Sequence, residues 1–295
     1  MLEVKNITKF FGTKEVLRNI SFEVSKGKIF GIIGPNGAGK TTALRIILGI
    51  LSPTEGKVLF EGKEFDQDFM NITGYLPEER GLYPKSSVIS TLVYLGQLKG
   101  LTKSESKKNA KYWLERLELS EYYKFNIEDL SKGNQQKVQF ISAILHNPKI
   151  LILDEPFSGF DPINQTIFRD IIFEFQKNSY IILSTHLMDL AQSLCDDVCM
   201  INNGEQIVSA KMNDLLNKNS KDIYEILTNT TEITTNEFKN FKILSQEKNY
   251  MQVQVFNDNF IKEITNSFNV KEIKKVSLSL HQLFIELLEN KNSDV

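Results

Sequence analysis

A glycine-rich segment near the N-terminus has the residue types and spacing of a phosphate-binding loop. Residues 34–41 read GPNGAGKT and fit the pattern G-x-x-x-x-G-K-[ST], between an apolar strand-like run (26–33) and a helical stretch (41–51). Glycines let backbone N–H groups turn inward around phosphate oxygens, and the following helix directs its positive end at the same point. We therefore expect a site for a nucleoside triphosphate, with contacts from Gly34, Pro35, Asn36, Gly37, Ala38, Gly39, Lys40, Thr41 and Thr42.

Two members of this loop have chemistry of their own. The ammonium of Lys40 would reach the β- and γ-phosphates, and the hydroxyl of Thr41 would ligate Mg²⁺. An ordinary glycine turn would require neither the lysine nor the hydroxyl. The pattern therefore predicts binding of a nucleotide together with a magnesium ion.

A pair of carboxylates follows an apolar run further along the chain. Residues 150–153 are all Ile or Leu and lead directly into Asp154 and Glu155. Ligand chemistry in parallel sheets takes place at the carboxyl ends of strands. One carboxylate beside Mg²⁺ and a second beside the γ-phosphate would supply a metal partner and a base that orients water. Beside a phosphate loop, this pair indicates nucleotide hydrolysis.

The elements that would position these groups are visible as periodic patterns. Residues 1–25 alternate like paired strands, and residues 86–148 are largely helical. Strand and helix then alternate over 149–156, 163–178, 180–185, 187–195 and 198–209. This alternation predicts an α/β fold, with a parallel sheet covered on both faces and an antiparallel portion near the N-terminus.

A shift in composition near Met212 marks a second part that is rich in Asn, Lys and Ile. Its expected strands are 222–227, 241–246 and 251–256, and its expected helices are 260–268 and 280–289. We therefore divide the chain into a domain over 1–213, with a helical subdomain at about 86–148, and a small α+β domain over 214–295.

The overall composition excludes several classes of protein. Hydrophobic residues make up 41% and charged residues 24%, which is typical of a folded globular chain. With 35 Lys and Arg against 37 Asp and Glu, the chain lacks the basic excess of a dedicated nucleic-acid binder. Its apolar runs are of strand length, so we expect neither a signal peptide nor a membrane-spanning segment. Cys195, Cys199, His146 and His281 fit no metal or disulfide pattern and are expected to be structural.

Further motifs resemble those of one family. Residues 130–136 read LSKGNQQ, which resembles the LSGGQ signature of ABC (ATP-binding cassette) ATPases, and residues 158–162, SGFDP, resemble the D-loop. His186 resembles the switch histidine, and Phe11 the aromatic residue that stacks on adenine. These landmarks occur in family order over residues 1 to about 213. The resemblance implies a P-loop ABC cassette with a parallel-sheet core, an antiparallel β portion and a helical subdomain.

The resemblance also implies how such a cassette works. Two cassettes would pair head to tail around two ATP molecules, each held by the phosphate loop of one and the signature of the other. Nucleotide contacts would then include Phe11, Ser131, Gly133 and Asp161. The implied catalytic residues are Glu155, which polarises the attacking water, His186, which contacts the γ-phosphate, and Lys40. Asp154 and Thr41 would hold Mg²⁺.

Two departures from the family pattern change the charge of the site. Glu78 stands where the wider family has Gln, within the stretch YLPEERGLYPK (75–85), which resembles a subset of bacterial ABC-2 type ATPases. Its carboxylate could still approach Mg²⁺ and the nucleotide, although it adds negative charge near the γ-phosphate. In the signature, Lys132 and Asn134 replace Gly and Gln, and Lys132 would face either the partner's phosphate or solvent. Ser131 and Gly133 remain, so we expect an active site.

The cassette alone leaves open what the hydrolysis drives. Our first interpretation is the motor of an ABC-2 type exporter, bound peripherally at the cytoplasmic face of the cell membrane. A separate permease would be gripped by the face between the Glu78 region and the helices of 86–120. The α+β tail resembles that of sodium-export and drug-resistance cassettes, and its role would be to stabilise the dimer, to regulate it, or neither.

Other interpretations stay open from the sequence. The second cassette would be another copy of this chain or a different protein. One alternative function is an ABC ATPase that acts on ribosomes or DNA without a permease. A further alternative is a nucleotide-binding regulatory subunit without turnover.

Overall fold

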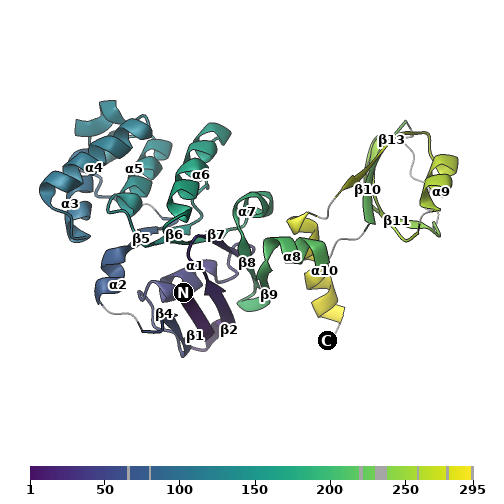
Figure 1. Ribbon diagram of the computed structural model, residues 1–295, viewed down its shortest axis with the longest axis horizontal. Coiled ribbons are helices and arrows are strands. Elements are labelled where there is room, and N and C mark those ends of the chain that lie inside the picture. Colours follow the sequence, from purple (N-terminus) through teal and green to yellow (C-terminus); the bar gives the residue numbers. More distant parts are fainter. Residues whose placement is uncertain are drawn as a thin grey trace. The chain divides into compact units, whose positions relative to one another are not determined.

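The computed structural model (Figure 1) divides into two compact units, Met1–Lys211 and Met212–Val295. It describes residues 1–64, 67–79, 81–218, 222–229, 238–257, 259–276 and 279–293. Arg80, within the stretch 75–85, lies outside the described residues. Each unit has its own hydrophobic core, so we treat the two separately.

The first unit begins with strands and alternates strands with helices over most of its length. Its elements are β1 (Leu2–Phe11), β2 (Lys14–Val24), β3 (Ile29–Ile33), α1 (Lys40–Ile47), β4 (Glu55–Phe60), α2 (Gln67–Ile72), β5 (Thr73–Leu76), α3 (Val88–Leu98), α4 (Lys103–Arg116), η1 (Ser120–Lys124), η2 (Ile127–Asp129), α5 (Lys132–Ile144), β6 (Ile150–Asp154), α6 (Pro162–Gln176), β7 (Tyr180–Thr185), α7 (Met188–Leu194), β8 (Asp197–Asn202) and β9 (Glu205–Lys211).

Among the described residues of this unit, nine strands form one sheet in the order β4-β1-β2-β9-β8-β3-β7-β6-β5. Strands β8, β3, β7, β6 and β5 run parallel to their neighbours in that series. Strands β4, β1 and β2 pair antiparallel. The predicted α/β class, with a parallel core and an antiparallel portion, is confirmed.

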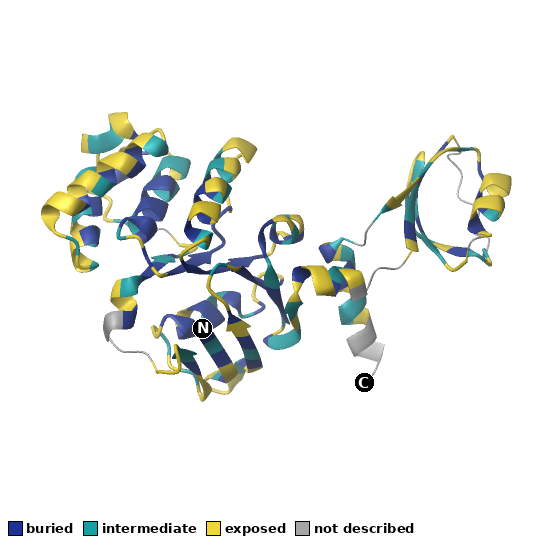
Figure 2. Ribbon diagram, viewed as in Figure 1, coloured by how far each residue is buried: buried dark blue, intermediate teal, exposed yellow. Residues whose placement is uncertain are grey.

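Helices cover both faces of the parallel strands, as Figure 1 shows for the region of β6 and β7. Helix α1 lies on one side, and α5 and α6 lie on the other. Every residue of β3, β6 and β7 is buried (Figure 2). A strand buried on both faces needs side chains that are apolar throughout, which explains the Ile- and Leu-rich runs of the sequence.

The expected helical region consists of α3, α4, two 3₁₀ turns and α5. Ser87 caps α3 by accepting a hydrogen bond from the backbone N–H of Ser90, and Thr102 and Glu105 form a reciprocal capping box at the start of α4. The guanidinium of Arg116 on α4 donates to both carboxylate oxygens of Glu174 on α6 at 2.7 Å. This bidentate pair attaches the helical region to a helix that covers the sheet.

The second unit is a four-stranded antiparallel sheet with helices. Its elements are α8 (Met212–Lys218), β10 (Asp222–Thr228), β11 (Phe241–Glu247), β12 (Tyr250–Val255), α9 (Phe260–Ser267), β13 (Val270–Val276) and α10 (Leu280–Ser293). The strand order among the described residues is β11-β12-β10-β13. Phe260 and Ile264 of α9 join Ile226, Met251 and Val253 of the sheet in one buried cluster. Strands β10, β11 and β12 and helices α9 and α10 occur where the sequence predicts them, whereas β13 and α8 were not predicted.

No helix in the part of the chain that the structure describes combines the length and apolar character needed to span a bilayer.

His146, in the turn between α5 and β6, makes the stability of the first unit depend on pH. Burial, assisted by the nearby Lys99 ammonium, lowers its pKa from 6.5 to about 4. Between these values the unfolded chain binds a proton that the folded chain does not, so the free energy of unfolding decreases as the pH falls through that window. From about pH 7 to about pH 5 the expected loss is about 2 kcal/mol, and a His146→Gln variant should not show it.

Urea unfolding, followed by the fluorescence of the chain's single tryptophan, Trp113, measures this difference in the first unit. His281→Gln, at an exposed position of α10 in the second unit, is the matched control and should keep the wild-type pH dependence. An unchanged pH dependence in His146→Gln would show that another group is responsible.

Candidate active site

The phosphate loop connects β3 to α1, and close backbone approaches restrict two of its glycines. A Cβ atom at Gly34 would lie 2.0 Å from the carbonyl oxygen of Ile201, so a larger residue cannot fit. Gly39 has a φ of +105°, and a Cβ there would lie 2.6 Å from the Leu17 side chain. These glycines are required because the loop is packed directly against β2 and β8.

Helix α1 presents an anion-binding end at this loop. Gly39 is its N-cap and provides no side-chain hydrogen bond, and the first turn contains no acidic residue. The first N–H groups of an α-helix have no partner within the helix and carry partial positive charge. Neither the cap residue nor a carboxylate in the first turn therefore competes with a phosphate for the start of α1.

Lys40 is held inside the loop and is only 6% exposed. Its ammonium donates to the carbonyl oxygens of Gly34 at 2.9 Å and Pro35 at 3.2 Å. It also forms an ion pair of 3.2 Å with Oε1 of Glu155. The lysine is thus oriented by three oxygens at the position where the loop would receive phosphate.

Glu155 links the loop to the end of β7. Its second carboxylate oxygen lies 3.0 Å from Nδ1 of His186, and its backbone N–H donates to Oγ of Ser184 at 3.1 Å. The backbone of Glu155 has a φ of +48°, in the left-handed region that non-glycine residues seldom adopt. The contacts on both sides of the residue hold it in this conformation.

Asp154, the last residue of β6, is buried and prepared for a cation. Its Oδ1 accepts a hydrogen bond from the Ser184 hydroxyl, while Oδ2 is buried without a hydrogen-bond partner among the described residues. Burial raises the pKa of Asp154, and the hydroxyls of Ser184 and Thr41 act in the opposite direction. A buried carboxylate oxygen without a donor is costly unless a cation binds it.

These residues fit Mg²⁺ as part of a nucleotide complex. Within the described ranges no three His, Cys, Asp or Glu side chains lie close enough to hold a metal by themselves. Mg²⁺ in proteins is commonly bound through one or two carboxylates together with substrate phosphates and water. The orphaned oxygen of Asp154, beside the hydroxyl of Thr41, matches that pattern.

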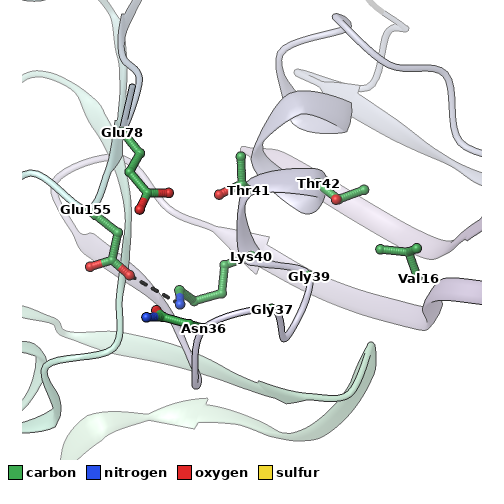
Figure 3. A pocket seen from close by; sticks show the side chains of 9 residues that line it. All are labelled: Val16, Asn36, Gly37, Gly39, Lys40, Thr41, Thr42, Glu78 and Glu155. Atoms are coloured by element: carbon green, nitrogen blue, oxygen red, sulfur yellow. Dashed lines mark ion pairs between the residues drawn. The ribbon is translucent and has the colours of Figure 1, made fainter. Parts of the chain in front are cut away.

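Lys40, Thr41 and Glu155 line one open cavity of about 380 Å³ (Figure 3), whereas Asp154 and His186 are not among its lining residues. In Figure 3 the carboxylates of Glu78 and Glu155 face the loop and the N-terminus of α1. The cavity is lined by Val16, Asn36, Gly37, Gly39, Lys40, Thr41, Thr42, Glu78 and Glu155. Eight of these nine were expected from the sequence, whereas Val16 was not. Ser184, which contacts both Asp154 and Glu155, was also missed, because a serine within an apolar strand has no distinguishing pattern.

Other residues expected to contact nucleotide do not line this cavity. Phe11 is 49% exposed at the end of β1, with the ammonium of Lys9 5.1 Å from the centre of its ring. Asp161 caps α6 through hydrogen bonds from the N–H groups of Ile163 and Asn164, and these bonds lower its pKa. Its side chain therefore already has a structural role.

The signature residues lie at the start of α5. Ser131 is the exposed N-cap of this helix, and its hydroxyl accepts a hydrogen bond from the N–H of Asn134. Gly133 is helical, and a Cβ atom there would meet nothing within 4 Å among the described residues. Lys132 is exposed. Packing among the residues that the structure describes does not explain the glycine, which costs about 1 kcal/mol relative to Ala inside a helix.

Comparison with known proteins identifies the family to which the chain belongs. The model of the ABC transporter family matches residues 17–158, from β2 to just beyond the paired carboxylates. The uncharacterized ABC transporter ATP-binding protein YhaQ of Bacillus subtilis is 38% identical over 97% of this chain and 98% of its own length. The linearmycin resistance ATP-binding protein LnrL, also of Bacillus subtilis, is 34% identical over 74% of this chain and 71% of its own length.

Solved structures share the fold of the first unit. The ATP-binding subunit of an ABC transporter superposes with a TM-score of 0.69 and 29% identity, over 74% of this chain and 92% of that one. The dimeric bacterial ABC transporter cassette MJ0796 gives a TM-score of 0.67 at 23% identity, over 72% of this chain and 99% of that one. Together with the match to YhaQ along nearly the whole of both chains, these findings show that the chain belongs to the ABC ATPase family, as an ABC transporter ATP-binding protein.

Proposed function

We propose that this chain is the ATP-hydrolysing motor subunit of an ABC-2 type exporter, which pairs with a second cassette around two ATP molecules and drives a separate permease. One observation carries the catalytic part of the proposal. The phosphate loop and Glu155, at the carboxyl end of β6, line a single cavity, and Glu155 joins the loop lysine to His186 after β7 through its two carboxylate oxygens.

The residues have separate tasks in the proposed reaction. The N–H groups at the start of α1 and the ammonium of Lys40 bind and orient the β- and γ-phosphates. Glu155 accepts a proton from the attacking water, and His186 holds the carboxylate from its other oxygen. Asp154, Thr41 and Glu78 would hold Mg²⁺, which when bound neutralises charge on the phosphates. Lys40 must exchange its contact with Glu155 for phosphate, which leaves the carboxylate available to the water.

Pairing of two cassettes is supported by unfilled binding features at the start of the signature helix, α5. Ser131 and the start of α5 form an exposed anion-binding end, and Gly133 leaves space that the described residues of this chain do not fill. A partner's γ-phosphate would use both features. Phe11 would stack on adenine, and Asp161 would contact nucleotide across the same interface. MJ0796, which shares this fold, is described as dimeric.

The exporter assignment is supported by the second unit and by one relative. The second unit is α+β rather than the all-β tail of sugar importers, and the relative LnrL is a linearmycin resistance ATP-binding protein. The proposed position is peripheral, at the cytoplasmic face of a membrane. Three exposed apolar side chains near α3, Tyr83, Tyr94 and Leu98, lie where the permease would dock. The rings of Tyr83 and Tyr94 are 6.2 Å apart.

We divide the protein into a catalytic domain over 1–213, with its helical subdomain at about 86–148, and an accessory domain over 214–295. The proposed division is supported by separate hydrophobic clusters in the two parts. The accessory domain would stabilise or regulate the pair of cassettes.

Glu155→Gln should abolish turnover while ATP binding persists. The amide keeps the size of the side chain but cannot accept the proton of water, so phosphate release should fall by about 10²- to 10⁴-fold. Gel filtration with ATP should show an accumulated dimer. Glu23→Gln, an equal charge change at an exposed position of β2, serves as the control. Normal phosphate release by Glu155→Gln would remove this residue from the mechanism.

A mild-detergent pull-down of the tagged full-length chain should recover a polytopic membrane protein, identified by mass spectrometry. Replacing Tyr94 and Leu98 by Ser should reduce that recovery, because desolvating apolar surface stabilises such contacts. Ile50→Ser, an exposed apolar residue between α1 and β4, should not reduce it. Recovery of ribosomal or DNA-bound proteins without a permease would instead support an ATPase that acts without one.

Removal of residues 214–295 should leave a folded catalytic domain that binds ATP, because the buried cluster beneath the loop consists of residues upstream of that point. Circular dichroism during thermal unfolding and binding of a fluorescent ATP analogue test this. An insoluble truncated chain would mean that the two parts share a core and that the proposed boundary is wrong.

A further inference from the structure

Gln139 is a buried amide on the signature helix that has no part in the function described above. It lies in the second half of α5, and its side chain is 4% exposed. The buried face of a helix that covers a sheet is normally apolar, and the neighbours Val138, Phe140 and Ile141 follow that rule. A polar side chain is retained at such a position only when its hydrogen bonds are satisfied.

The amide of Gln139 reaches the chain segment that follows β5. Its Nε2 donates to the carbonyl oxygen of Glu79 at 2.9 Å and to that of Pro77 at 3.3 Å. A glutamine amide has two N–H bonds, so each carbonyl can receive one of them. Both donors of a single side chain are therefore used on the residues that flank Glu78.

These two contacts restrain the backbone from which the Glu78 carboxylate projects. They hold the carbonyl before Glu78 and the carbonyl of Glu79, so the backbone of Glu78 is restrained on both sides. The side chain of Glu78 leaves this segment toward the cavity that contains Thr41 and Glu155 (Figure 3). An exposed carboxylate on a loop would otherwise sample many directions.

The same helix also contacts the chain beside the second carboxylate. Gln136, three residues before Gln139 and therefore on the same face of α5, donates to the carbonyl oxygen of Pro156 at 3.4 Å. Pro156 directly follows Glu155. Successive turns of α5 thus form hydrogen bonds to the backbone beside Glu155 and beside Glu78, the two carboxylates that line the cavity. The N-cap of the same helix is Ser131 of the signature.

We propose that Gln139 is a positioning residue that holds Glu78 against the metal and terminal-phosphate end of the nucleotide site, so that the place of Glu78 follows helix α5. The proposal rests on the proposed function, because it takes Glu78 as a ligand or close neighbour of the bound cation. Gln139 acts through the backbone of residues 77–79 and does not touch the nucleotide.

The experiment measures binding of Mn²⁺, a spectroscopic substitute for Mg²⁺, to the full-length chain saturated with the non-hydrolysable ATP analogue AMP-PNP. Electron paramagnetic resonance reports free Mn²⁺ and hence its Kd. Gln139→Met keeps the length of the side chain and removes both donors. We expect this variant to raise the Kd for Mn²⁺ about tenfold, because two hydrogen bonds beside the proposed metal ligand Glu78 are lost. The affinity for AMP-PNP without metal should stay within about twofold, because the hydrogen bonds of Gln139 go to residues 77 and 79 rather than to the phosphate loop.

A control variant lies on the neighbouring helix α4. Asn109 also donates from a side-chain amide to a backbone carbonyl, that of Leu145 directly after α5, at 3.0 Å. Asn109→Leu removes this contact without touching residues 77–79 or the signature. It should leave the Kd for Mn²⁺ within about twofold of wild type.

The decisive comparison repeats the substitution in a Glu78→Ala background. If Gln139 acts through Glu78, Gln139→Met should there change the Kd for Mn²⁺ by less than about twofold. An effect of undiminished size would mean that Gln139 supports the site in general, and would overturn the proposal. Should Gln139→Met not fold, Gln139→Ala lets water reach the two carbonyls and is measured in the same way.

The outcomes separate this proposal from the one on which it rests. A wild-type chain that binds no Mn²⁺ together with AMP-PNP would contradict the proposed nucleotide site itself. Normal Mn²⁺ binding by wild type, with an unchanged Kd in Gln139→Met, would contradict only the role of Gln139.

Discussion

The nucleotide site depends on one buried pair of opposite charges, Lys40 and Glu155, which lie 3.2 Å apart. Removing two charges from water is expensive, and their attraction offsets the cost only when further polar contacts complete the arrangement. Here Lys40 also donates to two loop carbonyls, and Glu155 contacts His186. The pair therefore joins the loop after β3 to the ends of β6 and β7, where phosphate and water would meet. A movement of the loop that displaces Lys40 would also free the Glu155 carboxylate to contact water.

The backbone at Glu155 is adapted to this pair. In a regular strand, successive side chains point to opposite faces, so Asp154 and Glu155 would be separated by the sheet. The φ of +48° at Glu155 ends that alternation, and both carboxylates come within the electrostatic influence of Lys40. Such a conformation costs about 1–3 kcal/mol and persists because Ser184 holds the residue through its N–H. The strained backbone at Glu155 thus places two carboxylates with different proposed functions at the end of one strand.

The sequence predicts those features that depend on residues close together along the chain. Loop, carboxylate pair and signature have motifs of fixed spacing, and strands such as β6 are apolar throughout, so both the cassette and most of its cavity could be expected. Strand β13 could not, because this edge strand is rich in lysine and exposes most of its residues. Strand β5 could not be predicted either, because it has only four residues, one of them a glycine. Val16, Ser184 and Gln139 were missed for another reason, since each contacts residues distant in sequence and none belongs to a motif.

Helix α5 shows why those long-range contacts matter for the family's mechanism. A Cβ atom at Gly74 of β5 would lie 2.0 Å from the carbonyl oxygen of Ala143, so helix and strand touch backbone to backbone. Close packing of this kind resists sliding, because any shift must compress one main chain against the other. A force on the N-terminus of α5, where Ser131 would meet a partner's phosphate, is therefore passed to β5 and its continuation at Glu78. In the proposed pair of cassettes, the glycine of one strand and the amides of one helix would thereby join two nucleotide sites that no single motif connects.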